Sequence, residues 1–241
     1  MNKLIDIHNH CLPKVDDGAK TIDEAIESIK NLFNLGFTDI VLTSHYIINT
    51  NFNKNVADRE KIFNKLKEKL NDIPINLYLG NEVFITDAKT LLNSLKIKEI
   101  TTLNNSKYLL IELPMHQFIQ QLDSIICTLN DAGIIPIIAH PERYSYYWDN
   151  PSKLKSLLEY NCYLQCNIDS INGLYGNRAK KMIKYLLKEN MVCTLATDTH
   201  YYRKQQIDKS LRKLEKLIGK EKLVQLTQTN PYIIINDLEL T

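Results

Sequence analysis

Seven short apolar runs recur along the chain, with amphipathic segments between most of them, and they constrain the fold more than any other feature. The runs are rich in Ile, Leu, Val and Tyr and have the length of buried parallel strands. Strands that alternate with helices predict an α/β fold with a parallel sheet. Seven units in 241 residues fit one closed or nearly closed barrel better than two domains. The runs occupy residues 4–7, 39–43, 75–79, 108–111, 134–139, 162–167 and 192–197.

The first intervening segment has clear helical signals. Thr21 and Glu24 form a capping-box pattern, an apolar stripe follows, and Gly36 supplies a left-handed stop. Further helices are expected at about residues 56–70, 118–132, 152–160, 178–189 and 206–218.

The charge balance excludes some function classes. The net charge is +2, from 30 basic and 28 acidic residues, so a strong nonspecific attraction for nucleic acid or membranes is not expected.

No apolar run reaches the roughly 18 residues of a membrane span, and the N-terminus lacks a signal-peptide pattern. Five cysteines, an odd number without a paired framework, indicate free thiols in a reducing compartment. We therefore expect a cytoplasmic protein.

Polar side chains follow six of the seven runs, where barrel enzymes place their chemistry. His8 and His10 follow the first run, and residues two apart in an extended segment point to the same side. Five of the six histidines lie at strand ends, and only His116 does not. The strand-end residues are His8, His10, His45, Glu82, Glu112, His140, Asp198 and His200.

These residues, together with Asp17 after the first strand, predict a metal site. Imidazoles and carboxylates without thiolates suit manganese, iron or zinc. Nine candidates exceed the needs of one ion, so two or three ions that share bridging carboxylates are expected. Two assignments stay open: Asp16 competes with Asp17, and Glu112 either binds a metal or orients a histidine.

The predicted cluster of metal ions indicates phosphoester hydrolysis. Clustered ions lower the pKa of a bound water and clamp the oxygens of a phosphoryl group, so hydroxide would be the nucleophile. Arg143 and Arg203, which follow two of the histidines, would bind the non-bridging phosphate oxygens. None of the cysteines is followed by Arg six residues later, and Asp-x-Asp and nucleotide-binding loop motifs are missing from the sequence. The aromatic residues at 144 and 146–148 either line the mouth of the site and stack on a tyrosine ring, or have a surface or packing role.

The motifs resemble those of the PHP (polymerase and histidinol phosphatase) superfamily. The closest resemblance is to its bacterial protein-tyrosine phosphatases of capsule and exopolysaccharide biosynthesis, and it covers nearly the whole chain. The segments that carry it are IDIHNH at 5–10, DDG at 16–18, TSH at 43–45, GNE at 80–82, IEL at 111–113, AHPERY at 139–144, TDTH at 197–200, NGLYG at 172–176 and NP at 230–231.

This resemblance implies a distorted (β/α)7 barrel of the TIM type, formed by residues 1–241 as a single domain, and a trinuclear site that usually contains manganese. Three ligand sets are implied: His8, His10, Glu82 and Asp198; Glu82, Glu112 and His140; and Asp17, His45 and His200.

The resemblance also implies a substrate. It would be phosphotyrosine on a bacterial tyrosine autokinase that governs polysaccharide export, with Arg143 and Arg203 as the phosphate-binding arginines. The main alternative is a PHP phosphoesterase that acts on a small molecule such as histidinol phosphate. A metal-binding module without catalysis and a nucleic-acid-processing enzyme are further alternatives that fit the sequence less well.

Overall fold

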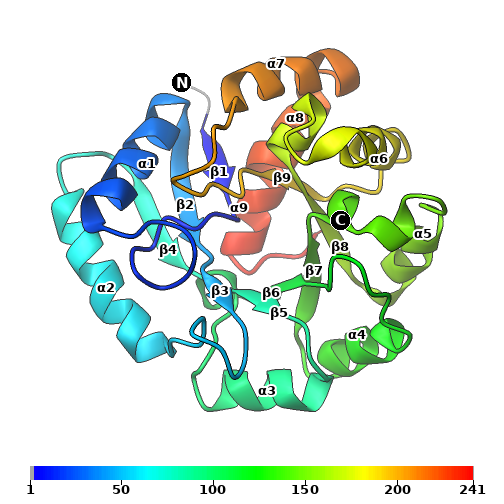
Figure 1. The fold of residues 1–241 in the computed structure, drawn as a ribbon, viewed down its shortest axis with the longest axis horizontal. Coiled ribbons are helices and arrows are strands. Elements are labelled where there is room, and N and C mark those ends of the chain that lie inside the picture. The colour runs from blue at the N-terminus through cyan, green and yellow to red at the C-terminus, as the bar shows by residue number, and fades with distance from the viewer. Residues whose placement is uncertain (1–2, 241) are drawn as a thin grey trace.

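The computed structural model describes residues 3–240, which form a ring of parallel strands surrounded by helices (Figure 1). All seven predicted strands are present, and the second and third are each divided in two. The strands are β1 (Leu4–Asp6), β2 (Phe37–Leu42), β3 (His45–Tyr46), β4 (Asn76–Leu79), β5 (Glu82–Phe84), β6 (Tyr108–Glu112), β7 (Ile135–Ala139), β8 (Tyr163–Asn167) and β9 (Thr194–Ala196).

The strands pair in parallel in two sheets, ordered β1-β2-β4 and β3-β5-β6-β7-β8-β9. Because β3 continues β2 and β5 continues β4, the two sheets follow each other around the ring. Between β1 and β9 the seam is held by a parallel bridge of Asn9 with Thr199 and by a hydrogen bond from Asp198 N to His8 O (2.8 Å). The predicted distorted seven-unit barrel is thus confirmed.

The side chain of Asp6 forms further hydrogen bonds across the seam between β1 and β9. This buried carboxylate accepts hydrogen bonds from Thr197 N (2.9 Å) and Thr197 Oγ1 (2.6 Å). The paired ends of the first and last strands are therefore fixed next to the segments that bear His8 and Asp198.

Within residues 3–240 the helices are α1 (Ile22–Asn34), α2 (Val56–Lys69), α3 (Ala88–Lys96), α4 (Leu122–Asp131), α5 (Lys153–Leu157), α6 (Gly176–Lys188), α7 (Ile207–Ile218), α8 (Lys220–Val224) and α9 (Asn230–Ile235). Shorter 3₁₀ turns lie at Leu103–Asn105, Pro141–Arg143, Ser145–Tyr147, Leu158–Tyr160 and Ile168–Asn172, and a π-helical turn at Gln225–Thr229. None of the helices in this described part of the chain has both the length and the apolar character needed to cross a bilayer.

The first helix begins as predicted, because the Thr21 side chain accepts a hydrogen bond from Glu24 N (3.2 Å), and Gly36 follows its end with φ 99°. Three helices were not predicted: α3, α8 and α9. They have only five to nine residues, which is too short for a helical period to stand out. The predicted helix at 118–132 was also too long, since α4 begins only at Leu122.

The apolar core has two parts. The larger one lies between the strands and the surrounding helices, and the smaller one fills the ring. Ile234 and Ile235 of α9 join side chains such as Ile7, Leu110 and Ile137 in the smaller core. Helix α9 crosses the centre of the ring (Figure 1), and Asn104 Nδ2, just before β6, donates to Ile235 O (2.9 Å). The amino ends of the strands are thus closed by apolar packing.

Candidate metal centre

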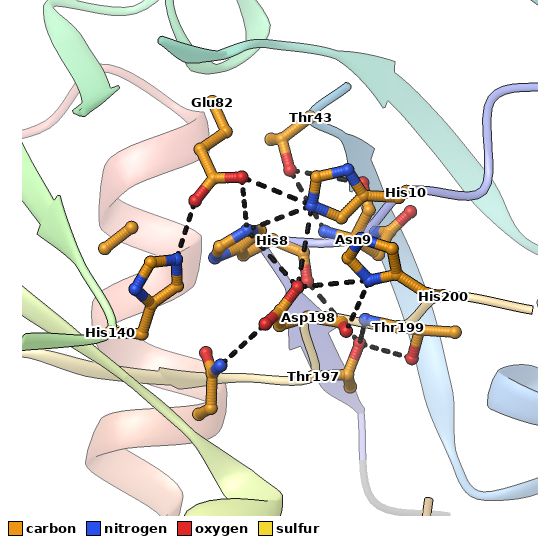
Figure 2. Close-up of polar contacts among 12 residues, drawn as sticks. His8, Asn9, His10, Thr43, Glu82, His140, Thr197, Asp198, Thr199 and His200 are labelled. Atoms are coloured by element: carbon orange, nitrogen blue, oxygen red, sulfur yellow. Dashed lines mark hydrogen bonds and ion pairs between the residues drawn. The ribbon is translucent and has the colours of Figure 1, made fainter. Parts of the chain in front are cut away.

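The nine predicted ligands converge at the carboxyl ends of the strands. They form four overlapping groups, and within each group one nitrogen or oxygen atom per residue lies within 4.8 Å of the others. The groups are His10, Asp17, His45 and His200; His8, His10 and Asp198; His8, Glu82 and His140; and His45, Glu82 and Glu112. Figure 2 shows four of the imidazoles directed toward the carboxylates of Glu82 and Asp198.

Glu82 lies at the junction of these groups. Its buried Oε2 is 3.2 Å from His8 Nε2, 3.3 Å from His10 Nε2 and 3.0 Å from His45 Nδ1. Its Oε1 is 2.8 Å from His140 Nε2. Burial alone would raise the pKa of Glu82, but the charges of His8 and His45 hold it well below its usual range. Glu82 is therefore an ionised carboxylate that can bridge two cations.

Asp198 divides its two oxygens between different neighbours. Its Oδ1 faces the histidines, at 3.8 Å from His8 Nε2, 3.5 Å from His10 Nε2 and 3.3 Å from His200 Nδ1. Its Oδ2 accepts hydrogen bonds from Asn167, Tyr175, Arg143 and Arg203. Asp198 has φ 48° and His140 has φ 33°, so two residues in the left-handed region present their side chains to the site.

Two polar neighbours fix the orientation of the first histidines. His8 Nδ1 donates to Gln165 Oε1 (2.7 Å), and His10 Nδ1 donates to Asp16 Oδ2 (2.7 Å). Each bond occupies Nδ1 and leaves Nε2 directed at the carboxylates, as in histidines that bind metals. The two histidines that follow β1 are thus preorganised before any cation binds.

The structure separates the roles of the two adjacent aspartates. Asp17 Oδ1 lies 3.3 Å from His200 Nε2 and 3.8 Å from His45 Nε2, whereas Asp16 orients His10. Asp16 also accepts from Gly18 N (3.0 Å), as expected of a residue that shapes the turn. A Cβ at Gly18 would lie 1.9 Å from the His10 carbonyl oxygen, so the turn requires glycine.

The donor set fits divalent cations. Asp17 Oδ1, His45 Nδ1 and Glu82 Oε2 are buried without a hydrogen-bond partner among the described residues, which is costly in the absence of a ligand. Burial lowers the pKa of His8 and His45, but nearby carboxylates outweigh it and raise these values to about 9 and about 10. Without cations, protons would therefore occupy these nitrogens.

Arg143 and Arg203 lie at the open edge of the cluster. Their Nη1 atoms are 3.1 Å and 2.9 Å from Asp198 Oδ2, and their side chains are 21% and 18% exposed. Each guanidinium uses one nitrogen on Asp198 and has further N–H donors for an anion. The two predicted phosphate-binding residues thus lie together beside the predicted metal ligands.

Three neighbours of the cluster are not among the site residues predicted from the sequence: Gln165, Asn167 and Tyr175. Gln165 and Asn167 are two apart on β8, so they share the face that lines the site, but neither titrates. Asn167, at the end of β8, donates to Asp198 Oδ2 (2.7 Å). Tyr175 belongs to the quoted NGLYG segment, where the sequence gives no sign of its direction.

The aromatic residues after Arg143 pack internally. Tyr144 is buried, donates through its hydroxyl to Ala139 O (2.8 Å) and accepts from Leu113 N (2.9 Å). Tyr147 is buried as well, and Trp148 Nε1 donates to Glu142 O (2.9 Å). The contacts of Tyr144, Tyr147 and Trp148 favour the packing alternative for the aromatic residues. His116 lies outside the metal cluster and contacts Ser145 Oγ (3.1 Å).

Comparison with known proteins identifies the family. The family model for capsular polysaccharide synthesis, CpsB/CapC, matches residues 4–236. The chain belongs to the CpsB/CapC family. CapC of Staphylococcus aureus is 37% identical over 82% of this chain and 77% of that protein. The tyrosine-protein phosphatase CpsB of Streptococcus agalactiae is 31% identical over 97% of this chain and 99% of its own.

A solved structure agrees with this membership. The chain superposes with a TM-score of 0.90 and 29% identity, over 99% of its length and 96% of the other chain, on a structure described for YwqE of Bacillus subtilis and CpsB of Streptococcus pneumoniae, metal-dependent tyrosine phosphatases. The resemblance inferred from the motifs is confirmed at the level of the CpsB/CapC family.

Proposed function

We propose that this CpsB/CapC protein is a metal-dependent phosphatase that hydrolyses phosphotyrosine in proteins, with residues 1–241 acting as one catalytic domain. The observation that carries the proposal is the convergence of nine imidazole and carboxylate ligands with two arginines at one end of the barrel. The named activities of CpsB and YwqE support the choice of substrate class.

We assign the metal-binding role to His8, His10, Asp17, His45, Glu82, Glu112, His140, Asp198 and His200. Their overlapping groups suit two or three ions, with Glu82 shared between sets. The ligand chemistry accepts manganese, iron or zinc, and we propose manganese. When bound, such ions lower the pKa of a coordinated water and neutralise charge on phosphoryl oxygens.

The residues of the chain would divide the remaining work. Arg143 and Arg203 would bind the phosphate oxygens with their free N–H donors and hold the phosphorus near the metal ligands. Asp198 would connect the two parts, because Oδ1 faces the histidines and Oδ2 faces the arginines. Gln165 and Asp16 would keep His8 and His10 in the tautomers that direct Nε2 inward.

We further propose that the substrate protein is a bacterial tyrosine kinase of polysaccharide biosynthesis and that the reaction takes place in the cytoplasm. The family description, capsular polysaccharide synthesis, supports the first part. The five free cysteines support a reducing compartment.

Hydrolysis of p-nitrophenyl phosphate and of a phosphotyrosine peptide by the manganese-loaded protein tests the proposal. We expect turnover of both and its loss with EDTA. Histidinol phosphate serves as the comparison substrate, and we expect a lower kcat/KM for it than for the phosphotyrosine peptide. Failure to hydrolyse any phosphomonoester with manganese, iron or zinc would reject the assignment, and a preference for histidinol phosphate would replace the substrate.

A further inference from the structure

Tyr175 lies beside the metal centre, but it is neither a proposed metal ligand nor a proposed phosphate-binding residue. It occupies the turn between the 3₁₀ segment Ile168–Asn172 and α6. Glycines with positive φ stand on both sides of it, Gly173 at 86° and Gly176 at 92°, and Gly176 N donates to Gly173 O (3.0 Å). This turn directs a half-buried tyrosine toward the open edge of the cluster.

The Tyr175 side chain contacts both arginines and the carboxylate that they share. Its hydroxyl is 3.0 Å from Asp198 Oδ2 and accepts from Arg203 Nη1 (3.2 Å). The Cζ atoms of Arg143 and Arg203 lie 4.6 Å and 5.7 Å from the centre of its ring. Two like-charged guanidinium groups repel each other, and a shared aromatic ring and a shared carboxylate oxygen offset that repulsion.

Two buried acids join the three loops that bring these residues together. Glu142, next to Arg143, accepts from Asn167 N (2.9 Å) and Ser170 Oγ (2.6 Å), which ties the loop after β7 to the loop after β8. Asp169 accepts from Gln206 N (2.7 Å) and from Ser210 Oγ, which ties the loop after β8 to α7. The Tyr175 loop is thus fastened on both sides, to the Arg143 loop and to the start of the helix that follows Arg203.

We propose that Tyr175 is a positioning residue that holds Arg143 and Arg203 in place to bind one phosphate group. The proposal rests on the proposed function, because that function supplies the phosphate. Free arginine side chains lose rotamer entropy when they bind an anion, and a ring that already restrains both of them removes part of that cost.

Two variants separate the ring from the hydroxyl. Tyr175→Leu removes both, and Tyr175→Phe keeps the ring beside the arginines. We expect Tyr175→Leu to weaken the binding of inorganic phosphate about tenfold, which corresponds to about 1.4 kcal/mol. We expect Tyr175→Phe to weaken it only about two- to threefold. Calorimetry with phosphate on the metal-stripped and manganese-loaded proteins measures both, and elemental analysis measures the metal content.

The matched control is Tyr185→Leu, which removes another half-buried tyrosine of the same α6 helix and should leave phosphate binding unchanged. Unaltered phosphate binding by Tyr175→Leu would overturn the proposal. Loss of metal in parallel with phosphate would also overturn it, because Tyr175 would then act on Asp198 rather than on the arginines. Absence of phosphatase activity in the unmodified protein would reject the proposed function, whereas the calorimetric comparison would still decide the role of Tyr175.

Discussion

The two ends of this barrel are built from the same strands but are filled in opposite ways. At the carboxyl ends, buried imidazoles, carboxylates and two arginines surround a polar centre. At the amino ends, residues such as Ile5, Val41 and Tyr108 pack against Ile234 and Ile235 of α9. One ring of strands therefore contains both a concentration of charged groups and an ordinary apolar core.

The two ends contribute differently to the stability of the fold. Buried charges without full partners cost free energy, so the carboxyl end is preorganised for a ligand at the expense of stability. Apolar burial at the amino end supplies stability without chemistry. Substitutions at the carboxyl end should therefore change mainly activity, and substitutions at the amino end should change mainly stability.

The largest effect is expected from Asp198→Ala. The substitution removes both the oxygen that faces the histidines and the anchor of the two arginines. We expect kcat/KM for p-nitrophenyl phosphate to fall about 10³-fold or more. Circular dichroism should show a folded barrel. Retention of more than about a tenth of the activity would contradict the division between the ends.

Ile234→Ala tests the opposite end. Ile234 is fully buried in the core inside the ring, so the truncation should lower the free energy of unfolding by about 2–5 kcal/mol. Urea denaturation measures this change. The kcat of the fraction that remains folded should stay within about twofold of the unmodified protein. A large loss of kcat in fully folded protein would show that the two ends are coupled.

Removal of metal should weaken the protein in a pH-dependent way. The pKa values of His8 and His45 are raised to about 9 and about 10 in the metal-free fold. Their protonation stabilises the metal-free protein below the unfolded value near 6.5, and that contribution disappears as pH rises through 9 to 10. Over the same range metal affinity should rise, because binding displaces those protons.

Thermal unfolding with manganese or EDTA at several pH values tests this expectation. A ligand at about 100 times its Kd adds about 2.7 kcal/mol, so the Tm should rise with manganese, and the gap should widen from pH 6.5 to 9. Calorimetry in two buffers of different ionisation enthalpy should show proton release at pH 7.5. Absence of proton release on metal binding would contradict the raised pKa values of His8 and His45.

The smallest effect is expected from Tyr108→Phe at the amino end. The Tyr108 hydroxyl donates to Leu238 O (2.7 Å) and fastens the segment after α9. Its loss should cost about 0.5–1.5 kcal/mol of stability, without a change in activity or metal content. Denaturation and elemental analysis together measure it, and an altered metal content would show that the apolar end also shapes the metal centre.

Much of this arrangement could be predicted locally. Each strand of the ring is a short apolar run, and a parallel barrel places the polar residues that follow such runs on one rim. The sequence alone therefore groups His8, His45, Glu82 and Asp198 in one site. The division of the second and third strands, at residues 43–44 and 80–81, was not predicted from the sequence. The short helix α9 was not predicted because it is too short to show a helical period, although it packs into the smaller core at the amino ends of the strands.

The alternating fold, the family motifs and the types of side chain at the rim follow from local sequence, because strand and helix periods and strand-end positions are local properties. Three relations depend on how the chain folds in space: Asp16 orients His10, Glu82 joins the ligand groups, and Tyr175 contacts both arginines. Those relations depend on the directions of side chains from loops far apart in the chain. The packing of the ring of strands sets these directions, and no local pattern records them.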